Sequence, residues 1–129
     1  MSSFGEDVQA VTELIGSHSV ILIGHSMGGS VIVEAARLMP NRIIGLIGVD
    51  TLNNIEHPMT TEKLKQMVAP LQKNFREASR QFVGKIIASA TDPKLREWIL
   101  SDMSSAPPSV AVSAINEMMA QYISGEAAK

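Results

Sequence analysis

The feature that most constrains this chain is a serine framed by glycines, in the run Gly24-His25-Ser26-Met27-Gly28. Four aliphatic residues before it, Val20-Ile21-Leu22-Ile23, favour a short strand. After it, the stretch from Ser30 to Met39 favours a helix that stops at Pro40. A Gly-x-Ser-x-Gly spacing with a strand before it and a helix after it is the sequence form of a nucleophile elbow.

The glycines of this run have a steric explanation. A sharp strand-to-helix turn brings backbone and neighbouring elements together, so we expect no room for a Cβ at positions 24 and 28. Ser26 at the apex is then expected to be strained, with its hydroxyl pushed out of the sheet. Adjacent side chains on a tight turn diverge, so we expect His25 to point back beneath the turn and to pack or hydrogen-bond there.

Two plainer interpretations compete for the same residues. The run could be a glycine-rich turn, or a loop that cradles a phosphate. A phosphate loop requires a lysine after its last glycine, whereas Ser30 and Val31 follow Gly29. The pattern therefore favours Ser26 as a nucleophile, with the simple turn as the alternative.

The flanking segments predict a parallel strand-helix-strand unit. Ser3-x-x-Glu6 predicts a capping box at the start of a first helix that ends at Gly16. Its apolar stripe is Val8, Val11, Leu14 and Ile15. The run from Ile43 to Val49 is almost continuously apolar, which is typical of a strand covered on both faces of a parallel sheet. The intervening helix predicts a right-handed crossover, with Gly28 and Gly29 allowing close packing on the sheet.

Beyond Asn53-Asn54 the pattern is helical only. Thr60 or Thr61 predicts the cap of a helix that runs to about Ala69, where Pro70 interrupts it. A second helix is expected over residues 71–88, with the candidate inward residues Leu71, Phe75, Phe82, Ile86 and Ile87. Asp92-Pro93 is a strong helix start, and Pro107-Pro108 opens a last helix that runs to about Tyr122.

The run from Val20 to Gly29 resembles the nucleophile elbow of α/β-hydrolase-fold serine hydrolases, and the resemblance covers nearly the whole chain. Residues 4–16 resemble the helix before the nucleophile strand, residues 43–52 resemble the next strand and its exit, and residues 58–122 resemble the helical cap. The resemblance implies an α/β fold class, a partial α/β-hydrolase fold. It divides the chain into a partial core with the elbow, residues 1–57, and a helical cap or lid, residues 58–129.

The resemblance also implies roles for the residues of the elbow. Ser26 would be the catalytic nucleophile, and the backbone N–H of Met27 would be one of two oxyanion donors. The elbow itself would comprise Gly24, His25, Gly28 and Gly29. Family members are longer, with an oxyanion loop before the elbow and an acid and a histidine after the cap. We find none of these segments here, so the chain looks like the middle of a hydrolase.

Asp50 is an alternative candidate for the triad acid. It ends the second strand, where ligand-binding groups collect in open α/β sheets, and some family members carry their acid there. The plainer interpretation is a residue that caps the exit loop. His57 completes the order Ser26, Asp50, His57, but the base should approach on a later loop, so a self-contained triad is disfavoured.

The implied activity is acyl transfer, and carboxylic esters are the leading substrate class. Thioesters, lipids and carbon–carbon bonds remain open, while serine at the apex argues against the dehalogenase and epoxide-hydrolase branches, which use aspartate there. The alternative is a non-catalytic truncated remnant or an interaction module. The expected partner is a small ester-type molecule, and open sheet edges predict self-association.

Composition excludes several other classes. The 129 residues carry a net charge of −2, with no electrostatic footprint for nucleic acid. The longest apolar stretch is far shorter than the ~20 residues of a membrane span. A start without basic residues or an apolar core is no signal peptide, and the absence of cysteine excludes disulfides and thiolate metal sites. We expect a cytoplasmic protein with no metal and no cofactor.

Overall fold

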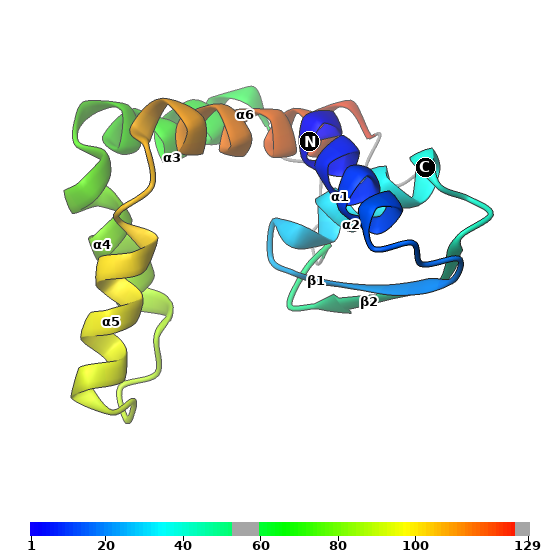
Figure 1. Ribbon diagram of the computed structural model, residues 1–129. Helices are drawn as coiled ribbons and strands as arrows, with labels where there is room; N and C mark the ends of the chain where they lie inside the picture. Colours follow the sequence, from blue (N-terminus) through cyan, green and yellow to red (C-terminus); the bar gives the residue numbers. More distant parts are fainter. Residues whose placement is uncertain (53–59, 126–129) are drawn as a thin grey trace. The chain divides into compact units, whose positions relative to one another are not determined.

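The structure is a computed structural model that describes residues 1–52 and 60–125 (Figure 1). Within these ranges the chain forms six helices and one parallel two-stranded sheet. It divides into two compact units. The first unit comprises residues 1–59 and 117–129, and the second comprises residues 60–116.

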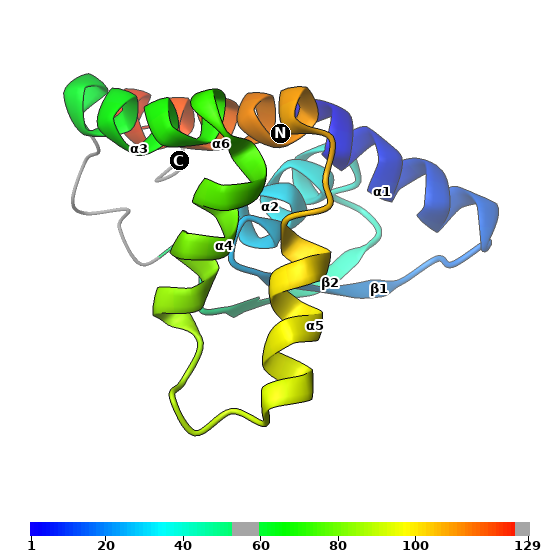
Figure 2. The ribbon, with the colours of Figure 1, turned by 90° about the vertical axis from the view of Figure 1, so that its left-hand side faces the viewer.

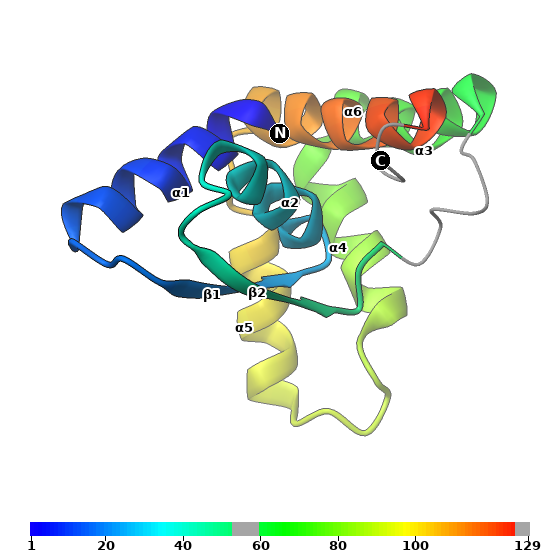
Figure 3. The same ribbon diagram turned by 90° about the vertical axis from the view of Figure 1, so that its right-hand side faces the viewer.

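The first unit is built around a parallel strand-helix-strand crossover. Its strands are β1 (Val20–His25) and β2 (Ile43–Val49), and its helices are α1 (Ser2–Leu14) and α2 (Gly28–Leu38). The parallel pairing predicted from the sequence is confirmed, with Ile23 opposite Ile47 and His25 opposite Val49. Helix α2 packs on both strands, and α1 packs on α2, so the sheet and the two helices form successive layers (Figure 1, Figure 3).

The packing of α1 on α2 differs from the expected apolar stripe. Gly5 and Thr12 are buried, and a Cβ at Gly5 would lie 2.9 Å from the Cβ of Glu34. Small residues therefore make the close contact with α2, while Val11 and Leu14 are 58% and 87% exposed. The predicted stripe is wrong at Val11 and Leu14, because this close helix-helix approach, and not apolar periodicity, sets the inward face.

The ends of α1 test the predicted start and stop signals. Its N-cap is Met1, with no side-chain capping bond, so the capping box at Ser3 and Glu6 is wrong: Ser3 already lies inside the first turn. The predicted end is confirmed, since Ile15 is the C-cap and Gly16 follows with φ +68°. A positive φ at this position is the ordinary reason for a glycine after a helix.

One face of the sheet has apolar side chains exposed. Side chains alternate along a strand, so Ile21 and Ile23 share a face, and the register places Ile47 and Val49 beside them. These four residues, here called the apolar sheet face, are 55%, 67%, 47% and 45% exposed in the order given. The expectation of a strand pair covered on both faces is wrong, because in the first unit α1 and α2 are layered on one face only.

The second unit consists of α3 (Thr61–Lys73), α4 (Phe75–Ile86), α5 (Pro93–Met103) and the first turns of α6 (Pro108–Ser124). Helix α4 packs on both α3 and α5 (Figure 2). Ser79 Oγ donates to the Met103 carbonyl oxygen at 3.1 Å, and Arg96 donates to that of Gly84 at 2.9 Å. Both bonds join α4 to the α5 segment.

The helix boundaries of this unit follow the caps more closely than the prolines. The Thr60 side chain accepts from the Lys63 N–H, which confirms the predicted cap of the first of these helices. Pro70 does not interrupt the helix; α3 continues to Lys73 and ends at Asn74, whose side chain caps α4. A proline inside a helix costs stability and can kink it without ending it. Asn74, with φ −152° and ψ 86°, leaves the helical region and ends the helical hydrogen bonding.

The inward positions predicted for α4 are partly correct. Phe75 is buried, as are Val68 of α3 and Val83 of α4. Phe82 and Ile86 are 57% and 66% exposed, so their inward assignment is wrong. The buried face is the one that passes through Phe75, Ser79 and Val83, which are spaced four residues apart on the helix.

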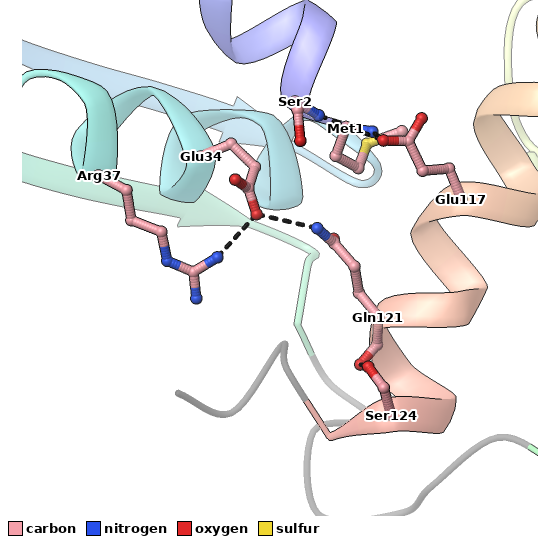
Figure 4. Close-up of polar contacts among 7 residues, drawn as sticks. All are labelled: Met1, Ser2, Glu34, Arg37, Glu117, Gln121 and Ser124. Carbon is pink, nitrogen blue, oxygen red and sulfur yellow. Dashed lines mark hydrogen bonds and ion pairs between the residues drawn. The ribbon is translucent and has the colours of Figure 1, made fainter.

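The last turns of α6 belong to the first unit (Figure 4). The Met1 ammonium forms an ion pair with Glu117, and Gln121 Nε2 donates to Glu34 Oε1 at 2.9 Å. Arg37 donates to the same oxygen at 2.7 Å. Burial lowers the pKa of the Met1 ammonium from its ordinary value near 8.0, and Glu34 partly opposes this shift. The assignment of residues 58–129 to a cap stays a prediction.

None of the helices in the described ranges combines the length and the apolar composition that crossing a membrane requires.

Candidate active site

Ser26 lies in the turn between β1 and α2. The strand ends at His25 and the helix begins at Gly28, so only Ser26 and Met27 lie between them. The side chain of Ser26 is exposed, and its φ is +51°. A positive φ is uncommon for a residue with a Cβ and costs free energy, so the surrounding contacts must hold it.

The glycines around Ser26 are not equivalent. A Cβ at Gly24 would collide with the carbonyl group of Gly28, at 2.6 Å from its carbon, as the sequence predicts. The same expectation at Gly28 is wrong, because a Cβ there would meet open space. The tight position is Gly29, where a Cβ would lie 2.7 Å from the Cβ of Thr51. The side chain of Thr51, two residues after β2, therefore occupies the space over the first turn of α2.

Two backbone groups of Ser26 are hydrogen-bonded to the end of β2. Its N–H donates to the Val49 carbonyl oxygen at 3.0 Å. Its carbonyl oxygen accepts from the Gly29 N–H at 3.0 Å and from the hydroxyl of Thr51. Ser26 is thus attached through its backbone to the strand beside it, and its own hydroxyl is exposed.

The backbone N–H of Met27 gives the turn a candidate site for a negative charge. It has no hydrogen-bond acceptor among the described backbone and side-chain groups. Met27 is the N-cap of α2, where helix N–H groups and the helix dipole favour negative charge, and the first turn carries no acidic residue. This arrangement is suited to receive an oxyanion beside Ser26 Oγ.

The histidines and Asp50 are placed differently. The side chain of His25 is exposed and makes no hydrogen bond with a described residue, so the expected contact beneath the turn is wrong. The strand extends through His25, and its alternation places that side chain on the face shared with Ile23. Asp50 follows β2 directly, at the same end of the sheet as Ser26, with an exposed side chain and φ +44°. His57 lies outside the described residues.

Thr51 is the residue of the site that sequence reasoning missed. The sequence pattern draws attention only to its neighbour Asp50 as a functional residue in this strand exit. The signal that could identify it is a β-branched hydroxyl residue two positions after the end of a strand, within reach of the glycine pair of the adjacent turn. Among the residues that the structure covers, no group of three or more His, Cys, Asp or Glu side chains is placed to hold a metal ion.

The comparison with known families agrees with this geometry. A family model described as the alpha/beta hydrolase fold matches residues 1–128. No curated protein matches the chain. The match spans nearly every residue, and the helices with the parallel two-stranded sheet are consistent with part of this fold. The chain therefore belongs to the alpha/beta hydrolase fold family, whose members are usually hydrolases.

Proposed function

We propose that the chain is a serine hydrolase that acts by acyl transfer on small carboxylic esters, with Ser26 as its nucleophile. The observation that carries the proposal is the exposed Ser26 at φ +51° between β1 and α2. A strained apex of this kind presents the hydroxyl away from its own sheet, where a substrate carbonyl can approach it. The elbow would consist of this apex with Gly24, His25, Gly28 and Gly29.

The chemistry follows from the groups at the turn. Ser26 Oγ attacks the ester carbonyl carbon while a histidine base accepts the hydroxyl proton. The carbonyl oxygen becomes an oxyanion that accepts from the Met27 N–H. Collapse of this intermediate releases the alcohol, which takes the proton from the histidine, and leaves an acyl group on Ser26. Attack by water then releases the acid and restores the hydroxyl.

The proposal includes a catalytic histidine other than His18, His25 and His57, the three histidines of this chain, because a triad base is expected on a later loop. His18 precedes β1, at the end of the strand opposite to Ser26, and His25 lies on the exposed face of the strand. Neither position suits proton transfer from Ser26 Oγ. Asp50 stays an alternative acid because it follows β2 at the same end of the sheet.

Covalent labelling tests the nucleophile directly. The 129-residue chain is incubated with a small fluorophosphonate, and the modified peptide is identified by mass spectrometry. Without a base to activate the hydroxyl, we expect the adduct to form slowly but still on Ser26, helped by the oxyanion donor at Met27. It should be lost in Ser26→Ala and retained in Ser19→Ala, which replaces an exposed serine before the same strand. No adduct on Ser26, or equal labelling of other exposed serines, would contradict the proposal and favour a non-catalytic interaction module.

Turnover of p-nitrophenyl acetate tests the position of the base. We expect slow hydrolysis, because oxyanion stabilisation without a base leaves the serine protonated and weakly nucleophilic. Turnover like that of an ordinary esterase, abolished by Ser26→Ala, would overturn this part of the proposal. It would instead favour Asp50 and His57 as triad partners, which Asp50→Asn and His57→Gln would then examine.

A further inference from the structure

We propose that Thr51 is a positioning residue for the nucleophile: its hydroxyl holds the carbonyl of Ser26 and thereby aims the Met27 N–H at the reacting oxygen. The inference rests on the proposed function, since it assigns a role in the same site. The observation behind it is the hydrogen bond from Thr51 Oγ1 to the Ser26 carbonyl oxygen, between residues 25 positions apart.

The planarity of the peptide bond links this contact to the chemistry. The carbonyl of Ser26 and the N–H of Met27 belong to one trans peptide group, in which they point in opposite directions. Two donors, Thr51 Oγ1 and the Gly29 N–H, hold the carbonyl on one side. The Met27 N–H must then point to the other side, where no described group accepts from it. Loss of one donor would let this peptide group rotate.

The neighbourhood of Thr51 is shaped to hold its side chain. Asp50 and Leu52 on either side have φ values of +44° and +58°, so the backbone turns sharply at both flanks of Thr51. A Cβ at Gly48 would lie 2.8 Å from Thr51 Cγ2, and a Cβ at Gly29 would collide with the hydroxyl. Two glycines thus leave space for one branched side chain. Its stiff χ1 keeps the hydroxyl directed at Ser26.

A purely structural role would be to stabilise the exit of β2. The two roles differ in what the loss of the hydroxyl changes. If the bond is only structural, its loss lowers the unfolding midpoint of the whole unit. A positioning bond affects the orientation of the Met27 amide and the rate of the covalent step, while the affinity for a small reagent stays unchanged.

The test compares Thr51→Val, which keeps the shape and removes the donor, with Thr51→Ser, which keeps the donor. Fluorophosphonate labelling of Ser26 is resolved into the reagent affinity KI and the maximal rate kinact. We expect Thr51→Val to lower kinact by about five- to tenfold, the effect of roughly one hydrogen bond, with KI unchanged. Thr51→Ser should stay within about twofold of the parent chain. If Thr51→Val fails to fold, Thr51→Ala is compared with Thr51→Ser, a pair that differs by the hydroxyl alone.

An NMR measurement separates this inference from the proposed function. We expect the amide resonance of Met27 to shift in Thr51→Val and to return in Thr51→Ser. Equal kinact in the parent and Thr51→Val, or equal losses in Thr51→Val and Thr51→Ser, would overturn the positioning role.

If the parent chain is not labelled at Ser26, the proposed function fails. The Met27 resonance then decides by itself whether Thr51 orients this peptide group, and an unchanged resonance rejects it.

Discussion

At the residue scale, the turn at Ser26 depends on where the backbone leaves space for a Cβ. Gly24 faces the carbonyl of Gly28, and Gly29 faces the side chain of Thr51, while Gly28 itself faces open space. Two glycines with the same place in a sequence pattern therefore have different physical roles. Gly24 permits close contact between strand and helix, whereas no steric requirement demands a glycine at position 28.

Gly24→Ala and Gly28→Ala form a matched pair that tests this difference. Gly24→Ala should lower the free energy of unfolding by about 2 kcal/mol or more, because its methyl group would overlap backbone that cannot move independently. Gly28→Ala should leave it unchanged or raise it by about 0.5–1 kcal/mol, since alanine is the better residue in a helix. Urea unfolding followed by circular dichroism measures both. Equal destabilisation by the two substitutions would contradict the geometry of the turn.

At the scale of elements, side-chain caps mark the starts of α3, α4 and α5 in the second unit. Thr60, Asn74 and Asp92 each accept hydrogen bonds from backbone N–H groups of the first turn that follows. Asp92 accepts two of them, from Lys94 at 2.9 Å and from Leu95 at 3.0 Å, and Pro93 begins the helix behind it. Its negative charge also lies at the favourable end of the helix dipole.

Asp92→Ala should therefore destabilise the chain by about 1 kcal/mol. Asp102→Ala is the matched control, because this exposed aspartate lies near the other end of α5, where the dipole disfavours a negative charge. We expect the control to be neutral or slightly stabilising in the same urea titration. A cost for Asp102→Ala equal to that for Asp92→Ala would show that capping is not the cause.

At the scale of the whole molecule, the apolar sheet face is a large area without a partner in the first unit. Ile21, Ile23, Ile47 and Val49 are all about half exposed or more, and both edges of the described sheet are open. Burying apolar surface contributes roughly 25 cal/mol per Å², and open strand edges can pair with another chain. We therefore expect association between copies to be favoured over an isolated chain in water.

We expect the purified chain to self-associate or to bind a hydrophobic dye. Ile23→Thr should shift sedimentation profiles toward the monomer and reduce dye fluorescence, because it replaces an apolar side chain on this face with a polar one of strand-compatible shape. Ile15→Thr is the control: Ile15 is equally exposed, at 66% against 67%, but lies at the end of α1. A compact monomer of the parent chain that unfolds cooperatively and binds no dye would contradict this expectation.

The sequence by itself determined the features that depend on short-range chemistry. The Gly-x-Ser-x-Gly spacing between an apolar run and a helical one predicts the strand-to-helix turn and a strained Ser26, whose φ is positive in the structure. Asp92-Pro93 predicts the start of α5, because a cap depends on groups within three residues. The parallel pairing of the two strands follows from the helix between them, which leaves no room for a tight hairpin.

Only the tertiary structure decided the features that join distant residues. Thr51 reaches the carbonyl of Ser26, and its side chain makes Gly29 the crowded glycine, because β2 pairs beside β1 in one particular register. The exposure of Ile23 follows from the layering of α1 and α2 on one face of the sheet. A hydrophobic pattern indicates which residues prefer burial. Which of them become buried depends on which surfaces meet when the elements pack.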